Sequence, residues 1–134
     1  MPALPALPAP RLPVLPWLAA GLMLLALPLQ ARPFPPEALR GELVVTAPPE
    51  VLLNQTPQRL APGARIRDGA NRVVLSGSLA GQKLLVHYTR FPDGQLRDVW
   101  LLTAAEAARQ PWPRTPAEAA AWRFDPPSQT WTKP

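Results

Sequence analysis

Proline most constrains what this chain can fold into. It accounts for 21 of the 134 residues, about three times its average share in proteins. Each proline fixes φ and lacks a backbone N–H donor, which excludes an ordinary all-helical protein. Seven of the prolines lie in residues 1–31 and fourteen in residues 32–134. The two parts of the chain therefore call for separate interpretations.

Residues 1–31 have the layout of a secretory signal peptide. A cationic start, formed by the amino terminus and Arg11, precedes an apolar run over Trp17–Leu27, and a small residue, Ala31, follows. This order predicts cleavage near Ala31 and a periplasmic or secreted mature protein.

Two alternatives for this segment stay open. The first is an uncleaved inner-membrane anchor over Val14–Leu29, although Pro16 and Pro28 interrupt it and a spanning helix needs about 20 apolar residues. The second is a disordered Pro-rich leader. In the anchored alternative, the N-terminal segment is the only contact with a membrane.

The next residues change pattern twice. Residues 32–40 are predicted to be a Pro-rich linker, mostly extended. In residues 41–102, short runs of β-forming residues alternate with turn residues, which predicts five or six short strands. So many short strands in so short a domain favour a mainly β fold, a small barrel or half-barrel.

The clearest hairpin joins Lys83–Arg90 to Gln95–Leu102 through a Pro-Asp-Gly turn. Alternation along the first arm places His87 on the face that points to solvent. In the second arm the apolar positions change phase, which predicts a β-bulge near Arg97 and Asp98.

Residues 103–134 are predicted to form a short helical, Pro-rich extension docked on the barrel. Thr103 with Glu106, and Thr115 with Glu118, have the spacing of capping boxes, so two short helices are expected. Helices this short need tertiary packing. The expected docking groups are aromatic: Trp112, Trp122, Phe124 and Trp131.

Few residues in this chain suit catalysis or metal binding. It has no cysteine and a single histidine, His87. A triad of His87 with Asp98 and either Ser76 or Ser78 has no recognisable spacing, and the carboxylates form no metal-binding motif. The sequence therefore predicts a protein that is not an enzyme, without catalytic residues, bound metal or cofactor.

The strongest candidate for binding is a cluster of arginines. Arg59, Arg65, Arg67 and Arg72 lie within 14 residues and are opposed only by Asp68. On one face they would form a site for an anionic envelope component such as a phospholipid head group, a lipopolysaccharide or a glycan. The alternative is a solvated strand edge.

A nucleic-acid ligand for these arginines is less favoured. Proteins that bind single strands interleave basic and aromatic side chains, because the bases stack on the rings. No Phe, Tyr or Trp occurs between Pro35 and His87. An exported protein also meets little nucleic acid.

About half of the chain resembles a group of uncharacterised proteins. The similarity rests on Gly41-Glu-Leu-Val-Val45, on Leu60–Ile66 and on the loop, strand, hairpin and strand of Leu79–Thr103. In these features the chain resembles small exported β-barrel proteins of GC-rich Gram-negative bacteria. The resemblance implies an oligonucleotide-binding-like or SH3-like barrel, and it transfers no catalytic residue.

These observations lead us to expect an exported cell-envelope protein that acts as a non-enzymatic binding or structural module. Its partner is expected to be an envelope protein or an anionic envelope component. Three features would discriminate the alternatives. An enzyme needs a serine or carboxylate within reach of His87, an anion binder needs its arginines on one face, and an interaction module exposes a strand edge or an apolar patch.

Overall fold

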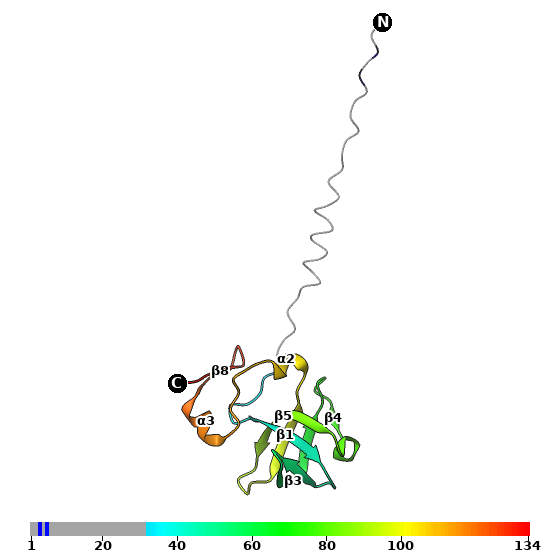
Figure 1. Cartoon of the computed structure of the whole chain (residues 1–134), viewed down its shortest axis with the longest axis vertical. Coiled ribbons are helices and arrows are strands. Elements are labelled where there is room, and N and C mark those ends of the chain that lie inside the picture. Colours follow the sequence, from blue (N-terminus) through cyan, green and yellow to red (C-terminus); the bar gives the residue numbers. More distant parts are fainter. Residues whose placement is uncertain (1–2, 4, 6–31) are drawn as a thin grey trace. The chain divides into compact units, whose positions relative to one another are not determined.

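The computed structural model describes Ala3, Pro5 and residues 32–134 (Figure 1). The chain divides into two units, Met1–Gln30 and Ala31–Pro134, and the folded domain belongs to the second. The predicted signal peptide or anchor in residues 1–31 lies outside the described residues, apart from Ala3 and Pro5.

The domain is mainly β, and the predicted fold class is confirmed. Five strands form a closed barrel, and one further strand extends it. The ring runs β2–β1–β5–β6–β3 and closes where β3 pairs again with β2. Its strands are β1 (Leu39–Val45), β2 (Glu50–Leu53), β3 (Thr56–Arg67), β5 (Lys83–Arg90) and β6 (Leu96–Leu101), and the additional strand is β4 (Val73–Val74).

Strand β3 is long because it serves two halves of the ring. Its first part pairs antiparallel with β2, and its last residues pair parallel with β6 and antiparallel with β4. The two β-forming runs Thr56–Leu60 and Ala64–Arg67 are thus one continuous strand of 12 residues. Gly63, at φ +79°, lets this strand bend between the two halves without ending.

The hairpin of β5 and β6 contains the predicted bulge. Tyr88 lies opposite Val99, whereas Arg90 lies opposite Leu96, so one extra residue is accommodated in β6. The extra residue falls at Arg97 and Asp98, as the change of phase in the sequence indicates.

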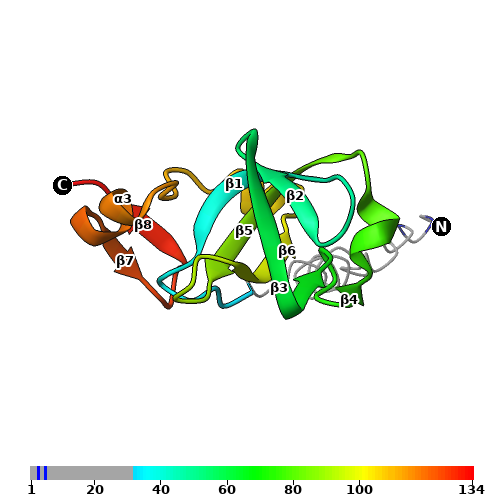
Figure 2. The ribbon, with the colours of Figure 1, turned by 90° about the horizontal axis from the view of Figure 1, so that it is seen from below.

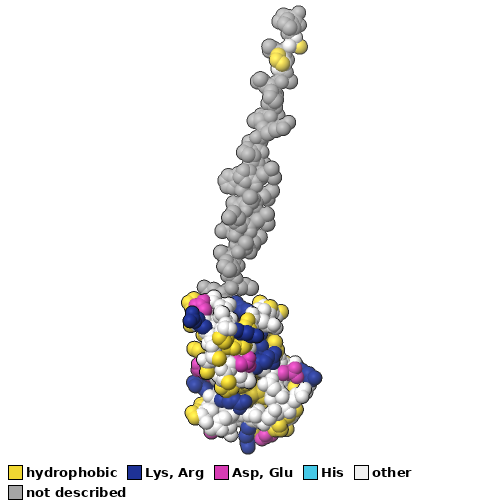
Figure 3. Space-filling view, turned by 60° about the vertical axis from the view of Figure 1, so that its left-hand side comes forward, with side chains coloured by type: hydrophobic (Ala, Val, Ile, Leu, Met, Phe, Trp, Pro, Cys, Tyr) yellow, Lys and Arg dark blue, Asp and Glu magenta, His cyan; other side chains and the backbone are white. Residues whose placement is uncertain are grey.

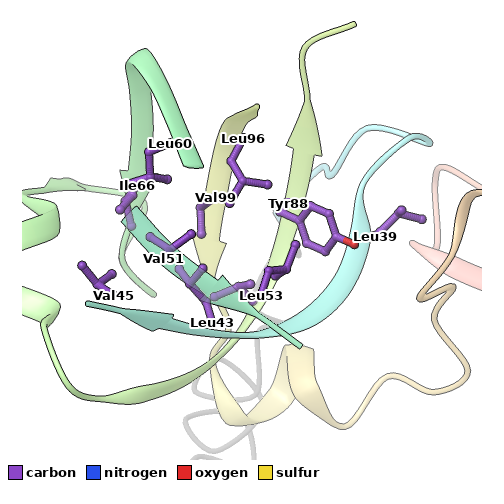
Figure 4. Close-up of a cluster of buried hydrophobic side chains, with 11 residues drawn as sticks. Leu39, Leu43, Val45, Val51, Leu53, Leu60, Ile66, Tyr88, Leu96 and Val99 are labelled. Carbon is purple, nitrogen blue, oxygen red and sulfur yellow. The ribbon is translucent and has the colours of Figure 1, made fainter. Parts of the chain in front are cut away.

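Aliphatic side chains fill the barrel. Alternate residues of the strands point inward and meet between β1, β2, β3 and β6 (Figure 4). Leu43, Val86, Leu96 and Val99 have no exposed surface. Burying one such side chain contributes about 1.5–3 kcal/mol, so the interior of this barrel is a hydrophobic core.

Residues 32–40 differ from the predicted linker. Phe34 and Ala38 are buried, and β1 begins at Leu39, inside the predicted linker. The reason is that side chains distant in sequence hold this backbone: Phe34 N donates to Gln129 Oε1 (2.9 Å), and Trp112 Nε1 donates to the Ala38 carbonyl (3.0 Å). The segment is part of the domain.

Beyond the barrel, both predicted helices are present. Helix α2 (Ala104–Ala107) begins at the full capping box of Thr103 and Glu106, and α3 (Pro116–Ala121) is capped by Thr115. A short 3₁₀ helix, η1 (Ser76–Leu79), follows β4. The sequence did not predict the hairpin of β7 (Arg123–Asp125) and β8 (Thr130–Thr132).

The C-terminal extension, with α3, β7 and β8, lies at one end of the barrel, and β4 lies at the opposite end (Figure 2). A second apolar cluster joins the extension to the barrel. Its buried members are Phe34, Ala38, Trp100, Trp112 and Trp131. Trp122 and Phe124 pack against it while half-buried, so all four expected docking groups take part.

Candidate functional site

His87 is buried, and its predicted solvent-facing position is wrong. Only 1% of its surface is exposed. Trp112 stacks on the imidazole with ring centres 4.1 Å apart, and Phe34 meets it edge-on at 4.5 Å. Alternation along β5 distinguishes two faces of the strand but does not show what covers each of them. The face that carries His87 is covered by Phe34 and Trp112, which are distant in sequence.

Arg40 is the polar partner of His87. Its Nε lies 3.3 Å from His87 Nε2, and its guanidinium also donates to the carbonyls of Glu106, Ala107 and Arg109. Because arginine only donates, Nε2 accepts and the imidazole proton resides on Nδ1. Nδ1 has no partner among the described residues.

This environment keeps the imidazole neutral. Burial lowers the pKa of His87 to about 2, and the positive charges of Arg40 and Arg32 contribute to the shift. A group that holds a proton so weakly is a poor general base at neutral pH.

The structure does not assemble the triad that the sequence suggested. Ser78 donates its hydroxyl hydrogen to the Leu75 carbonyl, and Asp98 forms an ion pair with Arg97 (3.5 Å). The described polar contacts of His87 include neither serine nor carboxylate. Within residues 32–134, no group of acidic or histidine side chains is placed to hold a metal ion.

A second buried polar group ties the start of the domain to α2. Arg32 pairs with both carboxylate oxygens of Glu106 (2.6 and 2.8 Å) and donates to the carbonyls of Asp68 and Leu101. Burial alone would raise the pKa of Glu106. Hydrogen bonds from Arg32 and Thr103 outweigh it and hold the pKa below its usual range. This cluster is structural.

The arginine cluster is divided by the fold. Arg65 and Arg67 line one surface hollow of about 350 Å³, together with Arg97. Arg59 lies in the part of β3 that pairs with β2, where it faces Glu50 at 3.6 Å. Arg72 lies in the turn before β4 and faces Asp68 at 3.5 Å. Two of the four candidate residues are therefore brought together.

Sequence reasoning missed the third arginine of this hollow. Arg65 pairs with Asp98 across the parallel contact of β3 and β6, and this contact places Arg97 in the same lining. The predicted bulge near Arg97 indicated an irregularity in this strand. No local pattern, however, predicts that β3 lies beside β6.

The hollow of Arg65, Arg67 and Arg97, which we call the arginine hollow, has a net positive charge. Asp98 is the one carboxylate in its lining, and it pairs with Arg97. Phe91 also lines the hollow: the Arg97 guanidinium lies 5.6 Å from its ring centre, and 38% of its surface is exposed. An anion with an apolar face is the chemistry that matches this lining.

On the face drawn in Figure 3, Lys and Arg side chains stand apart among apolar and neutral ones. The most exposed of the large apolar side chains lie elsewhere, in β4 and directly after it, where Val73 is 63% and Leu75 80% exposed. A strand edge that carries exposed apolar side chains, one of the features expected of an interaction module, is thus present as well.

None of the helices formed by the described residues is long and apolar enough to cross a membrane. Comparisons of the chain with protein-family models, curated proteins and solved structures find no match.

Proposed function

We propose that the protein is a non-enzymatic binding module that is exported to the cell envelope, where it binds an anionic glycan. The observation that carries the proposal is the convergence of Arg65, Arg67 and Arg97 on one hollow, with a single carboxylate among them. Charge-assisted hydrogen bonds from guanidinium groups to phosphate or carboxylate are the strong, geometrically specific kind.

The fold supports this choice of surface by analogy. Of the two barrel types that the sequence resembles, the oligonucleotide-binding type is a five-stranded Greek-key barrel, which binds oligonucleotides and oligosaccharides through its second and third strands and adjoining loops. The closed ring, with β3 beside β6, supports this type. Arg65 and Arg67 lie on the third strand, and Phe91 lies in the loop between β5 and β6. The analogy concerns the place of binding and not the ligand.

A glycan fits better than a nucleic acid for two reasons. Phe91 is the only aromatic side chain in the lining of the arginine hollow, whereas single-strand binders stack successive bases on several rings. One ring beside cations suits a sugar that carries phosphate or carboxylate. Residues 1–31, in addition, predict export, which brings the domain to envelope glycans.

The test compares two double variants of the full chain. Arg65→Ala/Arg67→Ala removes two cations from the arginine hollow, while Arg59→Ala/Arg72→Ala removes two exposed arginines that already face carboxylates. We expect the first variant to lose at least tenfold in affinity for purified lipopolysaccharide, about 1.4 kcal/mol. Its binding also becomes less dependent on salt concentration. The control variant keeps the affinity and the salt dependence of the parent.

Two outcomes would contradict the proposal. If the first variant binds lipopolysaccharide with unchanged affinity and salt dependence, the arginine hollow is not the site. If the parent binds a single-stranded oligonucleotide and ignores lipopolysaccharide, the ligand class is wrong.

Export is tested separately by cell fractionation with mass spectrometry of the N-terminus. We expect the protein in the periplasm or medium with a new N-terminus near Ala31. Intact Met1 in the cytosol would overturn export, and intact Met1 in the inner membrane would identify the segment as an anchor.

A further inference from the structure

A separate hollow of about 230 Å³ lies where the C-terminal extension meets the barrel, and we call it the junction hollow. Arg40 of β1 lines it on the barrel side, and Glu118 of α3 and Lys133 line it from the extension. The arginine hollow shares none of these residues.

Positive charge exceeds negative charge in the junction hollow. Arg40, Arg114 and Lys133 line it, with Glu118 as the one carboxylate. Burial lowers the pKa of Arg40, and the positive charge of Arg114 lowers it further. Two guanidinium groups therefore act on each other here, and in the described part of the chain neither forms an ion pair.

Glu118 offsets only part of this positive charge, and within the described residues it forms no ion pair with these cations. Its Oε1 accepts from the backbone N of Arg114 and from the Thr115 hydroxyl, both at 3.3 Å. The buried guanidinium of Arg40 donates to three backbone carbonyls, and the negative charge of Glu106 also stabilises it. Arg40 is buried, whereas Arg114 and Lys133 are exposed at the mouth of the hollow. This surplus of positive charge favours an anion in the junction hollow.

The walls between the cations are aromatic. Lys133 Nζ lies 5.3 Å from the ring centre of Trp122, and the Arg40 guanidinium lies 5.7 Å from that of Trp112. A neighbouring hollow of about 540 Å³ shares Gln110, Pro111 and Lys133 with this one. It is also lined by Trp131, which is 94% buried and whose indole N–H has no acceptor among the described residues.

We propose that the junction hollow binds a monocarboxylate that carries an apolar group, the chemistry of the last residue of a polypeptide chain. Arg114 and Lys133 hold the carboxylate, and the apolar group packs on the rings of Trp112 and Trp122. One negative charge suits this lining better than two, because the carboxylate of Glu118 remains in it.

The probe is N-acetyl-phenylalanine, and its amide is the matched uncharged control. Titrations of the full chain, followed by calorimetry and by tryptophan fluorescence, give both affinities. We expect the acid to bind at least tenfold more tightly than the amide, because a hydrogen bond between charged groups is stronger than one to a neutral amide. Bound acid also changes the tryptophan emission.

A matched pair of variants tests whether the acid binds in the junction hollow. Arg114→Ala/Lys133→Ala lowers the affinity for the acid about tenfold or more, whereas Arg123→Ala, an exposed arginine of β7 outside the lining, leaves it unchanged. Both variants retain the far-UV circular dichroism of the parent. Lipopolysaccharide binding also persists in the double variant, so failure here and failure of the proposed function are distinguishable.

Three results would overturn the inference. Equal affinity for acid and amide shows that charge plays no part. Displacement of the acid by equimolar inorganic phosphate shows that the site prefers a dianion. If Arg123→Ala loses as much affinity for the acid as Arg114→Ala/Lys133→Ala, only the overall positive charge of the extension matters.

Discussion

The barrel interior and the aromatic cluster under the C-terminal extension are both buried, but they are built differently. The barrel is filled by Leu, Val and Ile side chains, with Tyr88 as its only aromatic group. The second cluster is dominated by Phe and Trp, and Arg40, His87 and Glu106 are buried next to it.

The difference follows from where each backbone makes its hydrogen bonds. In the barrel, the strands satisfy one another, so non-directional aliphatic packing is sufficient. The segments around the second cluster contain many prolines and little regular structure. Side chains donate hydrogen bonds to their carbonyls instead. Arg40 donates to carbonyls at the end of α2, and Trp112 donates to the carbonyl of Ala38.

The largest expected effect comes from the barrel. Leu43→Ala removes a fully buried side chain of β1 and leaves a cavity that strands cannot close. We expect the free energy of unfolding to fall by about 3–4 kcal/mol. Chemical denaturation followed by far-UV circular dichroism and by tryptophan fluorescence measures it, and both signals move together because the second cluster rests on the barrel.

Val73→Ala is the control, since this side chain is 63% exposed, and we expect almost no change. A Leu43→Ala variant whose fluorescence transition stays at the denaturant concentration of the parent would show that the second cluster folds independently.

Arg40→Met tests the second cluster. It keeps an apolar stem but removes the donors to three carbonyls and to His87. We expect a loss of about 2–3 kcal/mol, because buried acceptors without donors are costly. The fluorescence transition should precede that of circular dichroism, since the extension loosens first. Arg123→Ala is the control, and coincident transitions in Arg40→Met would contradict the distinction between the two regions.

His87 makes the second cluster sensitive to acid. Its pKa is about 2 in the folded protein and near 6.5 when unfolded, so the unfolded chain binds the extra proton. Stability is therefore complete above pH 6.5 and decreases below it, by about 2 kcal/mol between pH 7 and pH 5. Denaturation at several pH values measures the slope.

The assignment to His87 can be tested directly because the chain has one histidine. In His87→Phe the slope between pH 7 and pH 5 should disappear. A slope that survives this substitution would exclude His87 as its source.

The smallest expected effect belongs to the ion pair of Arg32 and Glu106. A double-mutant cycle with Arg32→Met and Glu106→Gln should give a coupling energy of about 1–1.5 kcal/mol, more than an exposed pair because both side chains are largely buried. The exposed pair of Arg59 and Glu50 is the comparison, with an expected coupling below about 0.5 kcal/mol. Equal couplings would mean that burial adds nothing.

Features determined by neighbouring residues could be predicted from the sequence. The caps at Thr103 and Thr115 and the bulge at Arg97 each depend on positions a few residues apart. The five or six strands follow from the spacing of turn residues, and the ring of strands then follows from their number and shortness.

Features that join distant segments could not be predicted. His87 is buried by Phe34 and Trp112, and no local pattern brings these rings to β5. Arg97 joins Arg65 only because β3 and β6 pair in parallel. Alternation assigns a residue to one face of a strand, but only the complete fold determines what covers that face.

The Arg32 contacts have a mechanical consequence. This residue binds at once to α2 through Glu106, to the turn after β3 at the Asp68 carbonyl, and to the end of β6 at Leu101. In the alternative in which residues 1–31 stay attached as an anchor, tension applied to the chain ahead of Arg32 is therefore divided among three elements. The force reaches β1 only after the Arg32 contacts have broken. These contacts therefore protect the barrel from being unfolded one strand at a time.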